Sequence, residues 1–211
     1  ASLKKTNIKT AVIIGPSHYY NFKGFSIYHG RSYEIPFGQL LLNNTIIKKL
    51  KKKNNTIKYH PEAHKKEHSI EVQLPFLYYL NKHIDIIPII TGNNELTSLK
   101  TVAKDIYECI DKQNTIIIAS TDFSHFFPRK KATQMDKRAV DLIINYQTET
   151  IYRENKEKKI QLCGNEATII MLEILKKWKI NHFKHFSYSD SAVVTGQENT
   201  VVGYNSMSAY E

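Results

Sequence analysis

Three apolar runs, each followed by small or polar residues, constrain the fold of this chain more than any other feature. They cover residues 10–15, 84–91 and 115–120. The first run is almost entirely apolar and ends at Gly15-Pro16, which predicts a buried strand that stops there. The second run is closed by Gly92. We interpret all three as hydrophobic strands of one sheet.

Apolar residues at helical spacing lie between and after these runs. Helices are predicted around residues 46–50, 96–110, 132–146 and 167–178, and short strands around 56–59, 183–187 and 200–209. A further helix is expected to begin near Glu67, with Pro75 marking a kink or a new first turn. Residues 17–30 are predicted to be a polar and aromatic loop. This alternation implies a layered α/β fold, with antiparallel strands near the end.

Composition places the chain among globular proteins. Its 211 residues, 41% of them hydrophobic, are enough to bury a core as one domain. No apolar run reaches the length of a membrane span and no signal-peptide pattern is present, so no membrane partner is expected. The two cysteines, Cys109 and Cys163, provide no disulfide framework, which favours a reducing, cytoplasmic location. Cys109 is interpreted as packing in a helix.

The formal net charge of +10 raises the question of nucleic-acid binding. The excess charge is scattered, and its densest run, residues 48–53, ends a predicted helix, where lysines meet the negative end of the helix dipole. Basic and aromatic residues are not interleaved as they are on surfaces that bind single-stranded nucleic acids. A solvated face is therefore favoured over a nucleic-acid partner.

Polar side chains follow two of the predicted strands. Gly15-Pro16-Ser17-His18 follows the first apolar run, and Asp122-Phe123-Ser124-His125 follows the third. Because sites in open α/β sheets lie beyond the carboxyl ends of strands, these segments could converge on one crevice. His18 would present an imidazole there, or would be a loop histidine bonded to nearby backbone. Asp122 could orient His125 for proton transfer, or could cap a helix while His125 is exposed.

Cys163 comes directly before a predicted helix. A helix N-terminus stabilises a thiolate, which favours metal ligation or redox reactivity. The alternative is a small buried hydrophobic residue, because cysteine packs well in cores. Spacing along the sequence cannot separate these two interpretations.

A second polar group lies in the segment Glu67-His68-Ser69-Ile70-Glu71. Glu67 and Glu71 are expected to share one helix face. His68 and Glu71 are assigned a supporting role, in which they orient or tune a metal ligand. Helix capping and solvation explain the same residues equally well. His60 and His64 are predicted to be surface residues of a polar loop.

Taken together, these segments resemble the Memo family, also called AmmeMemoRadiSam system protein B. The resemblance rests on GPSH at 15–18, EHSIEVQLPFL at 67–77, IIPIITG at 86–92, ASTDFSH at 119–125, CG at 163–164 and VTGQENTVVGY at 194–204. It implies a single domain over residues 1–211, built as a three-layer α/β/α sandwich with a central, mostly parallel or mixed sheet. It also implies kinship in fold with class III non-haem iron extradiol dioxygenases.

Carried over by motif, the resemblance makes His18 and Cys163 metal ligands. Asp122 and His125 become the catalytic polar residues, with His125 at the position of the dioxygenases' acid–base histidine. The implied cofactor is iron(II), with copper as a competitor because a thiolate softens the site. The family's N-terminal Pro-His-Ala-Gly-Tyr motif, which carries another histidine ligand, is absent from this sequence. We therefore expect the chain to lack that strand segment and its metal site to be incomplete.

Two classes of function follow from the resemblance. The first is a metal-dependent redox or oxygenase-like protein that acts on an unknown small molecule, although fold kinship does not fix a reaction. The second is a non-catalytic module that uses the same crevice for anionic, phosphopeptide-like ligands, as animal relatives are linked to phosphotyrosine peptides. The family's name also suggests a radical-SAM protein as a partner.

Overall fold

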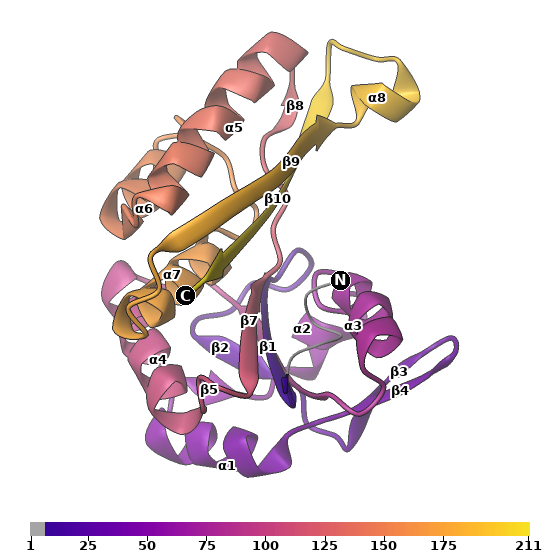
Figure 1. Cartoon of the computed structure of the whole chain (residues 1–211), viewed down its shortest axis with the longest axis vertical. Helices are drawn as coiled ribbons and strands as arrows, with labels where there is room; N and C mark the ends of the chain where they lie inside the picture. Colours follow the sequence, from indigo (N-terminus) through magenta and orange to yellow (C-terminus); the bar gives the residue numbers. More distant parts are fainter. Residues whose placement is uncertain (1–6) are drawn as a thin grey trace. The chain divides into compact units, whose positions relative to one another are not determined.

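The computed structural model describes residues 7–211 (Figure 1). These residues form two compact units, one ending at Ser120 and the other beginning at Thr121. Each unit is described by itself. The expectation that residues 1–211 make a single domain stays a prediction.

The first unit is built on a five-stranded mixed sheet with the order β5-β2-β6-β1-β7. Its strands are β1 (Thr10–Pro16), β2 (Phe25–Ile27), β5 (Ile57–Lys58), β6 (Asp85–Thr91) and β7 (Thr115–Ala119). β1 pairs in parallel with β6 and β7, whereas β2 runs antiparallel to β6. All seven residues of β1 are buried, as expected for a central parallel strand covered on both faces. The predicted α/β class with a mixed sheet is confirmed.

Helices cover this sheet, and Figure 1 shows α4 and α3 on opposite sides of it. The helices are α1 (Asn44–Lys53), α2 (Pro61–Lys65), α3 (Leu74–Leu80) and α4 (Leu96–Cys109), with a 3-10 turn, η2 (Glu71–Gln73), before α3. Asn43 caps α1 by accepting a hydrogen bond from the Ile46 amide at 3.2 Å. Pro75 lies in the first turn of α3, where its missing N–H costs nothing. Pro75 thus marks a new first turn.

The second unit contains an antiparallel sheet with the order β8-β10-β9. Its strands are β8 (His125–Phe127), β9 (His182–Asp190) and β10 (Val201–Tyr210). Its helices are α5 (Arg129–Ile144), α6 (Thr148–Lys156), α7 (Asn165–Lys177) and α8 (Ala192–Thr195). The expected antiparallel strands near the end of the chain are confirmed. Gly196, with φ of 70°, ends α8 before β10.

A buried carboxylate fixes the beginning of this second unit. Asp136 of α5 is fully buried and accepts hydrogen bonds from the Ser124 amide at 2.9 Å, the Ser124 hydroxyl at 3.0 Å and the Tyr188 hydroxyl at 3.0 Å. Burial raises the pKa of Asp136, while these hydrogen bonds act in the opposite direction. Gly203 leaves room for the carboxylate, because an added Cβ would lie 1.9 Å from its Oδ2 atom. The segment that leads into His125 is thereby held in place.

Several local predictions were wrong. The predicted loop 17–30 contains β2, and a hairpin of β3 (Ser32–Ile35) and β4 (Gly38–Leu41) follows it. Glu67 precedes η2, so it lies outside any helix and shares no helix face with Glu71. His64 is buried, with an exposed fraction of 9%, because ring and hydroxyl groups from other elements enclose it. Local polarity therefore misled the prediction in this region.

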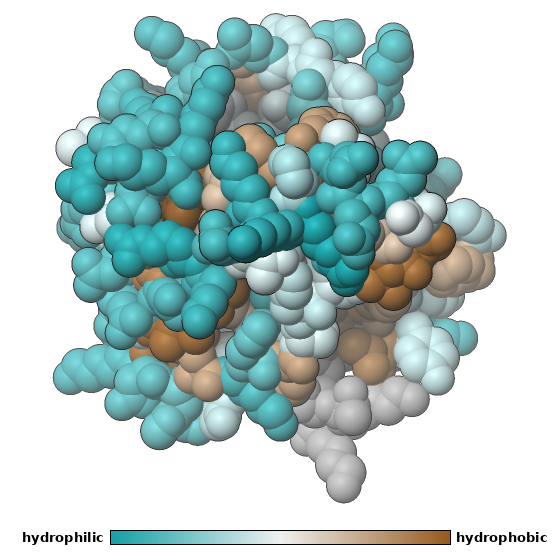
Figure 2. Space-filling model, turned by 90° about the horizontal axis from the view of Figure 1, so that it is seen from above, coloured by the Kyte–Doolittle hydropathy of each residue, from teal (hydrophilic) through white to brown (hydrophobic). Residues whose placement is uncertain are grey.

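None of the helices within residues 7–211 combines the length and apolar character needed to cross a bilayer. Hydrophilic side chains cover most of the face seen in Figure 2, with smaller hydrophobic patches between them.

Candidate functional site

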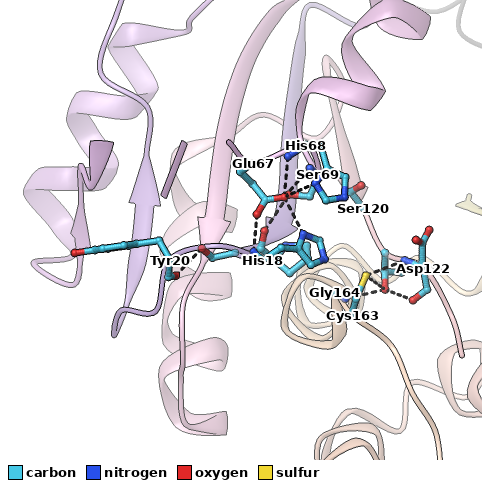
Figure 3. A network of polar contacts seen from close by, with 12 residues as sticks. His18, Tyr20, Glu67, His68, Ser69, Ser120, Asp122, Cys163 and Gly164 are labelled. Atoms are coloured by element: carbon cyan, nitrogen blue, oxygen red, sulfur yellow. Dashed lines mark hydrogen bonds and ion pairs between the residues drawn. The ribbon is translucent and has the colours of Figure 1, made fainter. Parts of the chain in front are cut away.

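His18 is held by a carboxylate from a distant part of the chain. Its Nδ1 atom lies 2.9 Å from Oε1 of Glu67, and its backbone amide donates to Oε2 of the same residue at 2.6 Å (Figure 3). His18 follows β1, whereas Glu67 lies between α2 and η2. The side chain of His18 is 32% exposed and that of Glu67 only 1%. The partly exposed imidazole is therefore held by a buried carboxylate.

The Glu67 carboxylate receives two further donors from its own loop. The amides of His68 and Ser69 donate to Oε1 at 2.9 Å and 2.8 Å. Burial alone would raise the pKa of Glu67, but the hydrogen bonds from His18 and Ser69 lower it below its usual value. An ionised carboxylate can only accept hydrogen bonds, so Nδ1 of His18 carries the proton. In the neutral ring, Nε2 is then the nitrogen with a free lone pair.

Glycine at the end of β1 allows this loop to approach. The Ser69 hydroxyl donates to the Pro16 carbonyl at 2.9 Å. A Cβ at Gly15 would lie 2.5 Å from that hydroxyl oxygen. The first glycine of the Gly-Pro-Ser-His segment thus lets Ser69, and with it Glu67, dock against the end of the strand.

His68 lies beside His18. Their rings stack with centroids 4.7 Å apart, and Nδ1 of His68 is 3.5 Å from Oε1 of Glu67. One potential ligand atom from each of His18, Glu67 and His68 falls within 4.8 Å of the others. Glu71, which was predicted to support a ligand, is exposed and begins η2. Glu67 makes the contact with His18 instead.

In the second unit, Cys163 lies two residues before α7, and Gly164 is the N-cap of that helix. Its Sγ atom accepts a hydrogen bond from the Asp122 amide at 3.0 Å and lies 3.7 Å from the Thr121 hydroxyl (Figure 3). Burial raises the pKa of the Cys163 thiol, although these hydrogen bonds oppose the effect. Desolvation thus acts against the thiolate that the helix N-terminus is expected to favour.

The structure brings Asp122, His125 and Cys163 into one neighbourhood. The amide of Cys163 donates to the Asp122 carbonyl at 3.2 Å. Nε2 of His125 is 3.8 Å from Oδ2 of Asp122, and the His125 amide donates to Gln161 Oε1 at 2.8 Å. The carboxylate is thus close to the ring but beyond hydrogen-bond distance. Gln161, which the sequence patterns did not single out, fixes the backbone of His125.

The donor sets of the two units fit a transition metal to different degrees. In the first unit, Nε2 of His18 offers a lone pair on a ring held by a carboxylate, the usual arrangement behind a histidine ligand. Oε1 of Glu67 already accepts several donors, so the carboxylate is better suited to orienting His18 than to ligation. In the second unit, Cys163 offers a soft sulfur donor, which must lose its proton to bind a metal.

Comparison with known proteins agrees with these motifs. The family described as Memo-like protein matches residues 1–208. A MEMO1 family protein of Thermoplasma volcanium is 36% identical over 217 residues, covering 99% of this chain and 77% of the relative. One from Thermoplasma acidophilum is 32% identical over 98% of this chain and 76% of the relative. One from Methanococcus vannielii is 33% identical over 94% and 72%. Because these matches span both units, the chain belongs to the Memo-like protein family.

Proposed function

We propose that this Memo-family protein binds a transition metal through His18 and serves a redox or oxygenase-like reaction on a small molecule. The observation that carries the proposal is the support of His18 by Glu67. A carboxylate with a lowered pKa accepts the Nδ1 proton, which fixes the orientation of the ring and leaves Nε2 as the nitrogen that a metal would bind. Iron(II) is the proposed ion and copper the competitor, because imidazole suits both.

The resemblance assigns Cys163 as a second ligand. The Asp122 amide already points at its sulfur, and such a hydrogen bond would stabilise the thiolate once a metal has displaced the proton. A bound iron ion would supply redox and Lewis-acid chemistry. His125, with its backbone held by Gln161 and its ring near Asp122, is proposed to move a proton to or from the substrate.

Metal stoichiometry after anaerobic loading with iron(II), and separately with copper, tests the proposal. We expect about one ion per chain and its loss in His18→Ala.

Cys163→Ala and His68→Ala then distinguish two ligand sets. Loss of binding in Cys163→Ala supports the ligands that the resemblance implies. Loss in His68→Ala but not in Cys163→Ala supports a ligand set within the first unit, made by His18 and His68. The exposed His83 provides a matched control, because His83→Ala should bind normally.

The absence of binding to every metal tested would overturn the metal proposal. The same chain should then be titrated with a phosphotyrosine peptide, because binding of an anionic ligand that survives Cys163→Ala would indicate a non-catalytic module instead.

A further inference from the structure

A cavity of about 540 Å³ lies in the first unit. This volume is within the usual range of small-molecule pockets, roughly 300–1,000 Å³. Side chains from four parts of the chain line it. Tyr28 follows β2, Tyr33 belongs to β3, Tyr59 follows β5, and His64 belongs to α2. None of these four residues has a part in the proposed metal chemistry.

The Tyr28 ring lies at a steep angle to each of the other two tyrosine rings. The rings of Tyr28 and Tyr59 are perpendicular, with centroids 5.9 Å apart. Those of Tyr28 and Tyr33 are 4.8 Å apart at 53°. All three rings belong to the lining of the cavity, so a cation held there could contact more than one ring through its π-face.

His64 forms a neutral, fixed part of the cavity wall. Its Nε2 atom lies 2.9 Å from the Ser26 hydroxyl and its Nδ1 atom 3.3 Å from the Tyr33 hydroxyl. Ser26 is itself fixed, because its hydroxyl oxygen accepts the His60 amide at 2.9 Å. Burial lowers the pKa of His64 to about 4, so the ring adds no positive charge near pH 7.

The charged residues of the lining also favour a cation. Glu34 and Glu62 contribute two carboxylates, and Lys65 contributes one ammonium group. The lining within the described part of the chain contains no arginine, the side chain most used to recognise phosphate. An anionic ligand would therefore meet more negative than positive charge here.

We propose that this cavity binds a small organic cation of the methylated-ammonium class, with Tyr28, Tyr33 and Tyr59 around its methyl groups and Glu34 and Glu62 nearby. Methylated cations suit such a site because they carry charge without a tightly held water shell, and their methyl groups pack on aromatic faces. The proposal is independent of the metal site.

Titration with tetramethylammonium chloride, followed by calorimetry and by NMR, tests this inference. Neopentyl alcohol, a neutral molecule of similar branched shape, and sodium chloride at equal ionic strength are the reference titrations. We expect saturable binding of the cation alone, with nuclear Overhauser effects between its methyl protons and tyrosine rings. Equal binding of neopentyl alcohol would overturn the cation proposal, because the cavity would then select shape and not charge.

Variants locate the binding. Tyr59 is 37% exposed, so replacing it should leave the fold intact. Tyr59→Leu is expected to weaken binding roughly threefold to tenfold, as for the loss of one cation–π contact, while Tyr59→Phe retains it. Glu62→Gln should also weaken it. Tyr210→Leu, at the exposed end of β10, is the matched control and should bind like the parent chain. Unchanged affinity in Tyr59→Leu would refute the assignment.

Discussion

The side chain of Ser69 lies too close to Gly15 to leave room for a Cβ atom at position 15. An added Cβ at Gly15 would be 2.5 Å from Ser69 Oγ and 2.8 Å from its Cβ. Both atoms belong to the loop that carries Glu67 to His18. The close approach of Ser69 to Gly15, at the end of β1, therefore helps to place the Glu67 carboxylate that holds the proposed metal ligand His18.

Gly15→Ala should therefore destabilise the protein and disturb the site together. Overpacking at a buried position costs roughly 1–3 kcal/mol of unfolding free energy, which urea unfolding would measure. Gly196→Ala is the control for the site, because nothing lies within 4 Å of an added Cβ there and its cost arises from the φ of 70° alone. We expect Gly196→Ala to leave metal binding unchanged. A Gly15→Ala chain as stable as its parent would contradict the packing described here.

Glu67→Gln should weaken metal binding without abolishing it. The amide retains the size of the carboxylate but loses the charge that holds the Nδ1 proton of His18. Loss of such a partner typically lowers metal affinity about 10–100-fold. Competition with a coloured chelator would measure the affinity. Glu71→Gln is the matched control, since Glu71 is exposed. If Glu71→Gln weakened binding and Glu67→Gln did not, the support would belong to Glu71, the residue that the sequence alone assigned to this role.

The sequence predicts the sheet better than the loops around it. The strands β1, β6 and β7 are long apolar runs, and burial on both faces leaves such runs few alternatives to a central strand. The hairpin β3–β4 carries no comparable signal, because its eight residues mix polar and apolar types without clear alternation. Its existence depends on packing that a local pattern does not record.

The site shows the same division. His18, Asp122, His125 and Cys163 stand out because they follow strands or precede a helix. The pairing of His18 with Glu67 spans 49 positions, and no spacing rule within one helix or strand reaches so far. The helical pattern after position 67 instead suggested that Glu67 and Glu71 act together. The docking of this loop on Gly15 and Pro16 places Glu67 against His18 and leaves Glu71 exposed.

Acidification should cost stability through His64. Its pKa in the folded chain is lowered to about 4 by burial, with His60 and Lys51 acting in the same direction and Glu67 opposing them. The folded state therefore binds fewer protons than the unfolded state between pH 6.5 and about 4. The stability contribution is fully present above pH 6.5 and is lost as the pH falls toward 4. The shift corresponds to about 3 kcal/mol at most.

Urea unfolding of the parent chain and of His64→Gln, from about pH 7 down to about pH 4, would isolate this contribution. Carboxylates titrate in both proteins, so the difference between the two curves reports on His64. We expect the parent chain to lose more stability on acidification than the variant. Parallel curves would show that His64 does not resist protonation in the folded state.

Asp136 should be the most sensitive polar position in the second unit. Asp136→Ala removes the acceptor for the Ser124 amide and hydroxyl and for the Tyr188 hydroxyl. Buried donors left without partners cost about 3 kcal/mol or more in total. Tyr188→Phe removes the hydrogen bond to Asp136 and the longer contact of 3.5 Å with the Thr133 hydroxyl, and should cost about 1 kcal/mol. Because Ser124 precedes His125, the alanine variant should also broaden or shift the NMR signals of the His125 ring. Tyr188→Phe should leave those signals unchanged. If the His125 signals were also unchanged in Asp136→Ala, the buried carboxylate would have no part in positioning the proposed acid–base residue.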